Sequence, residues 1–127
     1  MERPDSDINY IYHIVPMIDW KNATFKGIYA PSSIRINGFI HCSTYNQVFH
    51  VANRNYRNLH GLCLIKIDER CVHSEIKWEP SISRDNIGND EVYPHIYGPL
   101  NLDAVYGVYF FPCNEDGYFS TTPINHN

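Results

Sequence analysis

The hydrophobic and polar positions along the chain predict several strands and two helices. Residues 9–15 form the first apolar stretch, and their β-branched and aromatic side chains favour a strand. The stretch is almost continuously apolar, which indicates a central strand, and Pro16 ends it. Further strands are predicted at residues 39–42, 62–67, 75–79, 92–97 and 104–111.

Residues 17–25 and 43–57 are typical of helices. The first follows a proline, ends at Gly27 and places Met17, Trp20 and Phe25 on roughly one side. In the second, Thr44 and Gln47 have the spacing of a capping box, in which each side chain bonds the backbone N–H of the other residue. The apolar face of this helix consists of Val48, Phe49, Ala52 and Tyr56.

The remaining segments are predicted to be irregular. We expect loops at residues 31–38 and 80–89, and the second is long enough to be a lid or a site loop. A tight turn at residues 114–117 should open a hairpin into residues 118–119. The order of the elements predicts a single α+β domain over residues 1–127, with a loose arm at 1–8 and a tail at 120–127.

Composition narrows the functional classes. Aromatic residues make up 14% of the chain, which excludes a charged, disordered protein. The net charge of −4 argues against a nonspecific nucleic-acid binder and against binding to anionic membranes. The sequence shows no export signal or spanning segment, so we expect a cytoplasmic protein whose four cysteines are reduced thiols. No paired ligand spacing predicts a metal site, and none is expected.

Three histidines, His13, His41 and His95, lie in or beside predicted strands. A histidine in an apolar strand must place two ring nitrogens, and the commonest solution is a hydrogen bond to backbone in the core. Three such positions in one small domain favour a shared polar cleft. Because neighbours on a strand face opposite sides, Cys42 should face the core if His41 faces the cleft.

Other polar and aromatic residues are candidates for the same cleft. Ser43 and Thr44 stand where a strand opens into a helix, where backbone N–H groups favour anions, although capping alone would explain them and Gln47. Glu79 is the best-placed acid for general-base or charge-stabilising work. The candidates for stacking on a planar ring are Trp20, Trp78 and Tyr97.

Two sequence blocks, residues 38–44 (GFIHCST) and 94–100 (PHIYGPL), carry a resemblance to a known family. Together with residues 11–15 and the segments around them, they resemble the Domain of Unknown Function 952 family over about residues 10–119. That family is similar to the ADP-ribosyltransferase superfamily. The resemblance implies a split, twisted mixed β-sheet with two or three helices.

The resemblance also implies a ligand. His13 and His41 match the His-His subgroup that contains the RNA 2′-phosphotransferases, whose histidines hold the riboses of NAD while the nicotinamide–ribose bond breaks. Tyr12 stands where those enzymes have an Arg. Candidates for the third-motif residue are Glu79, His95 and Tyr97.

The resulting hypothesis is an enzyme or pseudo-enzyme that handles NAD or an ADP-ribosyl nucleotide. The candidates for catalysis are His13, His41 and Glu79. His13 would bind a ribose hydroxyl, His41 would contact the ribose or polarise the leaving group, and Glu79 would act as a general base or stabilise charge. The groups expected to bind the nucleotide are His13, Trp20, His41, Ser43, Thr44, Gln47, His95 and Tyr97. The alternative is a noncatalytic module that binds a small ligand or a protein on the same scaffold. A phosphoesterase with paired His-x-Ser/Thr motifs ranks lower, because only residues 41–43 match.

Overall fold

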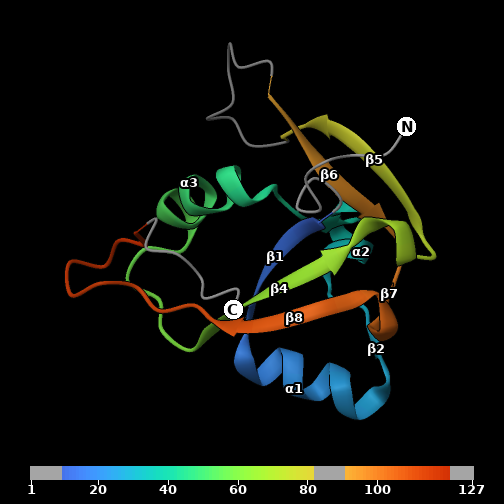
Figure 1. The fold of residues 1–127 in the computed structure, drawn as a ribbon, viewed down its shortest axis with the longest axis horizontal. Coiled ribbons are helices and arrows are strands. Elements are labelled where there is room, and N and C mark those ends of the chain that lie inside the picture. The colour runs from blue at the N-terminus through green and yellow to red at the C-terminus, as the bar shows by residue number, and fades with distance from the viewer. Residues whose placement is uncertain (1–9, 82–90, 121–127) are drawn as a thin grey trace.

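The computed structural model describes residues 10–81 and 91–120, and three helices and three small sheets form its core (Figure 1). The elements are, in chain order, β1 (Tyr10–Pro16), α1 (Met17–Lys26), β2 (Ile28–Tyr29), α2 (Ser33–Asn37), β3 (Ile40–His41), α3 (Tyr45–Asn55), β4 (Leu62–Asp68), β5 (Glu75–Pro80), β6 (Val92–Tyr97), β7 (Leu100–Asn101) and β8 (Val105–Phe110).

The strands form three sheets, with orders β1-β4-β8, β2-β7 and β3-β6-β5. The α+β class is therefore confirmed. All pairings between the described strands are antiparallel, whereas we expected a mixed sheet. Strands that follow a helix here pair with a distant strand that runs in the opposite direction, so no parallel neighbour arises.

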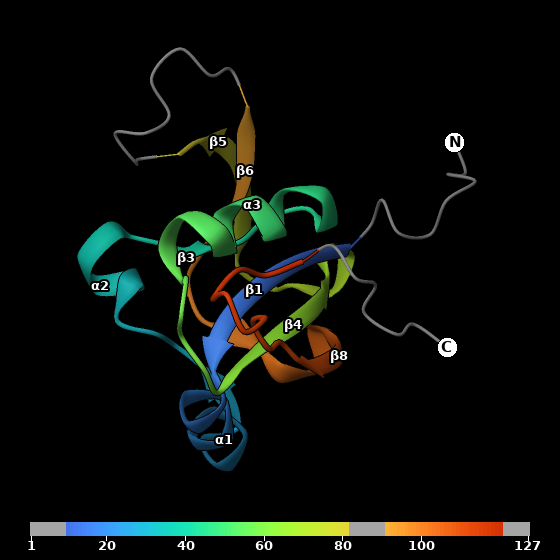
Figure 2. The same cartoon turned by 90° about the vertical axis from the view of Figure 1, so that its left-hand side faces the viewer.

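The first strand, β1, was predicted to be central, but it is the end strand of the order β1-β4-β8, in which β4 is the middle strand. It also links two of the sheets. One edge pairs with β4 along its whole length. The other edge makes a single bridge, in which the backbone groups of Tyr12 and Ser43 exchange hydrogen bonds of 2.7 and 2.8 Å. Beyond this bridge β3 diverges from β1 to pair with β6, so the sheet splits there (Figure 2).

Both faces of β1 are covered. Ile11 and Val15 belong to one core cluster with Trp20 and Cys42, and Tyr12 and Ile14 belong to a second. In that second cluster lie Val48, Phe49 and Ala52, which are buried on α3. The continuous apolar pattern of residues 11–15 reflects this burial on two sides.

The capping box of α3 is confirmed. The backbone N–H of Gln47 donates to the Thr44 hydroxyl over 3.2 Å, and the backbone N–H of Thr44 donates to the Gln47 side-chain oxygen over 3.0 Å. Two N–H groups that an isolated helix leaves unpaired are thereby satisfied. The first turn of α3 is thus fixed directly after β3.

One helix face was predicted wrongly. Trp20 and Ala23 are buried on α1, but the Phe25 side chain is 94% exposed. Phe25 is five positions after Trp20, and this step places the two side chains about 140° apart around a helix. None of the described helices has the length and apolarity needed to cross a membrane.

Short elements also differ from the sequence-based prediction. Residues 33–37, expected to be a loop, form α2, which ends at Gly38 in a left-handed conformation with φ +94°. The two-residue strands β2 and β7 were not predicted. The turn at Asn114–Gly117 is present, yet residues 118–119 form no strand. Most of the predicted lid at 80–89, the arm at 1–8 and residues 121–127 of the tail lie outside the described residues.

Alternation along β3 follows the prediction. The His41 side chain is exposed, and Cys42 is 3% exposed and packs in the core. Burial raises the pKa of the Cys42 thiol, so the neutral form is favoured. All four cysteines are free thiols in the structure.

We expect Cys42→Ala to destabilise the fold by about 1–2 kcal/mol, because removal of a packed sulfur leaves a void in the core. Cys71→Ala is the matched control, since Cys71 is exposed and free. The free energy of unfolding from urea titration measures both changes. Equal stability of the two variants would contradict the packing of Cys42.

Candidate functional site

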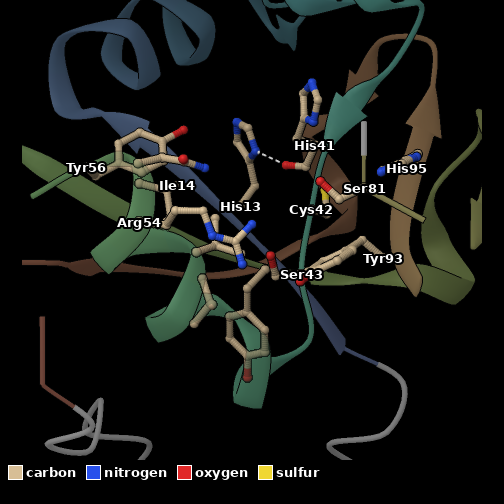
Figure 3. Close-up of a pocket in the computed structure, with 14 residues that line it drawn as sticks. His13, Ile14, His41, Cys42, Ser43, Arg54, Tyr56, Ser81, Tyr93 and His95 are labelled. Atoms are coloured by element: carbon tan, nitrogen blue, oxygen red, sulfur yellow. Dashed lines mark hydrogen bonds between the residues drawn. The ribbon is translucent and has the colours of Figure 1, made fainter. Parts of the chain in front are cut away.

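A cavity of about 240 Å³ lies where the sheet splits, between β1, β3, β6 and α3 (Figure 3). His13, His41 and His95 all line it, so the prediction that the three histidines share one cleft is confirmed. The other lining residues are Tyr12, Ile14, Cys42, Ser43, Val48, Val51, Arg54, Asn55, Tyr56, Ser81 and Tyr93.

His13 has both ring nitrogens bonded inside the protein. Its Nδ1 lies 2.6 Å from the His41 carbonyl oxygen, and its Nε2 lies 2.7 Å from the Tyr29 hydroxyl. A carbonyl only accepts, so Nδ1 carries the proton and the neutral Nε2 accepts the Tyr29 O–H. Burial lowers the pKa of His13 from 6.5 to about 4, which keeps the ring neutral.

His41 is the most accessible of the three histidines. Its Nε2 donates to the Asn37 side-chain oxygen over 2.9 Å, so the unpredicted helix α2 orients the ring. Partial burial lowers the pKa of His41, and the nearby His95 adds to the effect. The His41 and His95 ring centroids are 5.8 Å apart.

His95 and Glu79 form a hydrogen-bonded pair across β5 and β6. Nδ1 of His95 lies 2.8 Å from the Glu79 carboxylate, which also accepts the Tyr97 hydroxyl over 2.6 Å. Both hydrogen bonds lower the pKa of Glu79, and the one from Tyr97 has the larger effect. The His95 ring stacks on Phe39 with centroids 3.9 Å apart. Glu79 therefore lies behind His95 and outside the cavity lining.

The other predicted site residues divide into two groups. Ser43 lines the cavity next to the histidines. Thr44 and Gln47 do not line it, and Gln47 instead ties α3 to residues 91–92 through its amide nitrogen. Trp20 packs edge-on against Tyr29 in the core, away from the cavity.

The two remaining aromatic candidates also lie outside the cavity lining. The Trp78 side chain is exposed on β5. Tyr97 is held by Glu79, and the Lys77 amine lies 4.6 Å from the centre of its ring. The aromatic side chains that do line the cavity are Tyr12, Tyr56 and Tyr93.

Arg54 was missed by the sequence reasoning. It lies on α3, lines the cavity and contributes a positive charge beside Tyr93. The Tyr93 hydroxyl donates to Glu91. Burial raises the pKa of Tyr93, and the nearby Arg54 opposes that rise. Helical spacing could have found Arg54, because Val48, Val51 and Arg54 recur at three- and four-residue steps from Thr44.

No metal-binding geometry is found in residues 10–81 or 91–120. No three His, Cys, Asp or Glu side chains in these ranges come together as a metal site. The cavity instead offers imidazole, hydroxyl and guanidinium groups, which recognise hydroxyls and phosphates.

We expect the free energy of unfolding to fall as pH drops from about 6.5 to 4, because the unfolded chain binds a proton at His13 and the folded chain does not. The slope from this site is about 1.4 kcal/mol per pH unit, and it vanishes above 6.5. His13→Asn keeps a donor near the Nδ1 position but cannot titrate. Urea titrations at several pH values should show a shallower slope in the variant, and identical slopes would contradict a buried neutral His13.

Comparisons with known proteins identify the family of this chain and solved structures with a similar fold. The model of the family "Protein of unknown function (DUF952)" matches residues 14–108. The crystal structure of protein CC0527 from Caulobacter crescentus is 25% identical with a TM-score of 0.76, and the match covers 87% of this chain and 93% of that one. The solution NMR structure of CC0527 gives a TM-score of 0.72 at 25% identity, with 88% and 92% covered. No curated protein matches. Because the family model spans most of the described strands, the chain belongs to the DUF952 family.

Proposed function

We propose that the cavity binds a nucleotide of the ADP-ribosyl class, such as NAD or ADP-ribose. The observation that carries the proposal is the convergence of three histidines and one arginine, from β1, β3, β6 and α3, on one cavity. The resemblance of the chain to the ADP-ribosyltransferase superfamily supports it. A cavity where a sheet splits is also a preformed cleft of the kind that small ligands occupy.

The contacts suggest a role for each group. Arg54 is a suitable partner for a phosphate, because its guanidinium offers several donors in a fixed fork. His41 is exposed at the mouth, and its Nδ1 can accept a ribose hydroxyl because Nε2 already donates to Asn37. His13 has no nitrogen to spare, so it shapes the cavity wall and does not hold a hydroxyl.

The alternative function, a noncatalytic binding module, has one observation in its favour. Glu79, the acid expected to act in catalysis, is held by two hydrogen bonds behind His95 and lies outside the cavity lining. A binding module needs no acid in contact with the ligand. The two functions share the cavity and differ in whether the ligand is changed.

We expect isothermal titration calorimetry to detect binding of NAD or ADP-ribose to the wild-type protein. His41→Ala and Arg54→Gln should each weaken binding about tenfold, since each removes one hydrogen-bonding or charged group from the ligand. His73→Ala is the matched control, because His73 is exposed and lies outside the cavity lining. Its affinity should stay within about twofold of the wild type.

Two results would contradict the proposal. No heat with NAD, ADP-ribose or nicotinamide at millimolar concentration would exclude the nucleotide class and leave the binding-module function with another ligand. Equal losses of affinity in His41→Ala and His73→Ala, with both variants folded, would show that the cavity is not where the nucleotide binds.

A further inference from the structure

His95 combines deep burial with a ring nitrogen that the described protein does not use. The residue is 2% exposed, and its Nδ1 is bonded to Glu79. Within residues 10–81 and 91–120, no group forms a hydrogen bond with Nε2. A buried polar atom without a partner carries a cost, and a bound ligand or water group relieves it. The ring lines the cavity, so the ligand side is where that partner would lie.

The surroundings fix both the orientation and the tautomer of this ring. Phe39 stacks on it with an interplanar angle of 15°. The ionised Glu79 carboxylate only accepts hydrogen bonds, so Nδ1 carries a proton, and in the neutral tautomer of the ring the lone pair is on Nε2. Tyr97 in turn holds the same carboxylate oxygen over 2.6 Å. The hydrogen bond to Glu79 therefore leaves Nε2, not Nδ1, as the position where the neutral imidazole can accept a proton.

Strand register explains why Glu79 reaches His95. In the β5–β6 pairing Glu79 stands opposite Tyr93, and His95 stands opposite Lys77. Glu79 and His95 are thus diagonal neighbours on one face, a separation that a long side chain spans. Lys77 lies over the Tyr97 ring instead of pairing with Glu79, which leaves the carboxylate to the imidazole and the phenol.

We propose that His95 is a general base that takes the proton of an O–H group bound in the cavity, with Glu79 as its positioning residue. A carboxylate on Nδ1 holds the ring and stabilises the imidazolium that forms when Nε2 gains a proton. The inference rests on the proposed function and deepens it, because it makes the site catalytic and names a second reactant. That reactant is water or an alcohol hydroxyl.

In the proposed reaction NAD is the electrophile. The O–H bond breaks, and its proton moves to Nε2 of His95. The oxygen forms a bond to the ribose carbon that carries nicotinamide. The carbon–nitrogen bond breaks, and its electron pair stays on the nitrogen, so neutral nicotinamide leaves.

The first test needs no ligand. Nitrogen-15 NMR of the histidine side chains in the full chain should show His95 with a protonated Nδ1 and an unprotonated Nε2. His95→Asn serves to assign the signal. A proton on Nε2 instead of Nδ1 in the neutral ring would overturn the proposal, whatever the protein binds.

The second test measures nicotinamide release from NAD. His95→Asn keeps a donor toward Glu79 and removes the base, so kcat should fall about 100-fold while the calorimetric Kd for NAD stays within about threefold. Glu79→Gln keeps an acceptor for Nδ1 but loses the charge, and its kcat should fall about tenfold or more. Glu75→Gln is the control, since it makes the same change on the same strand away from His95, and its kcat should be unchanged.

The outcomes separate the two proposals. Binding of NAD without nicotinamide release, or full kcat in His95→Asn, would overturn the general base and leave the nucleotide site standing. Absence of binding would overturn the nucleotide proposal and this inference with it. Mass spectrometry of reactions with and without methanol identifies the second reactant, because water gives ADP-ribose and the alcohol gives its methyl glycoside.

Discussion

The architecture of the cavity depends on the His13 imidazole, which bridges the His41 carbonyl and the Tyr29 hydroxyl at the point where the sheet splits. A strand that leaves its neighbour exposes backbone groups, and a buried carbonyl without a partner costs about 1–3 kcal/mol. The imidazole takes the place of the missing ladder partner. It holds β1, β2 and β3 together at the divergence, where the cavity opens.

Burial is the main reason that the His13 ring stays neutral. The His41 carbonyl requires the proton on Nδ1, and because burial disfavours a charge, the neutral Nε2 accepts the Tyr29 hydroxyl. His41 is the opposite case, because its ring is accessible although its backbone carbonyl is held by His13. His13 thus forms part of the cavity wall, and the His41 ring is the more accessible group in the cavity lining.

The sequence predicts the elements that local pattern determines and misses those that depend on partners. The strand at 9–15, the capping box of Thr44 and Gln47 and the opposite faces of His41 and Cys42 follow from residue type and period. The strand pair β2–β7 has only two residues on each side, too short for any periodicity. Phe25 was misplaced because a shared helix face was assumed over a step of five residues.

The same distinction applies to the cavity. Three strand histidines can be recognised in the sequence, yet their hydrogen-bond partners cannot. Tyr29, Asn37 and Glu79 are 16, 4 and 16 residues from the histidines they bond. Arg54 was overlooked because only the residues around the cap of α3 were considered as ligand-binding groups, and Arg54 lies near the other end of that helix.

The position of β1 between two core clusters has a consequence for motion. Its residues pack against one cluster through Ile11 and Val15 and against the other through Tyr12 and Ile14. Neither cluster can open locally without exposing the same strand, so the two behave as one cooperative unit. The amide hydrogens that form the ladder between β1 and β4 should therefore exchange with solvent only through global unfolding, whereas local opening involves the segments outside these two strands.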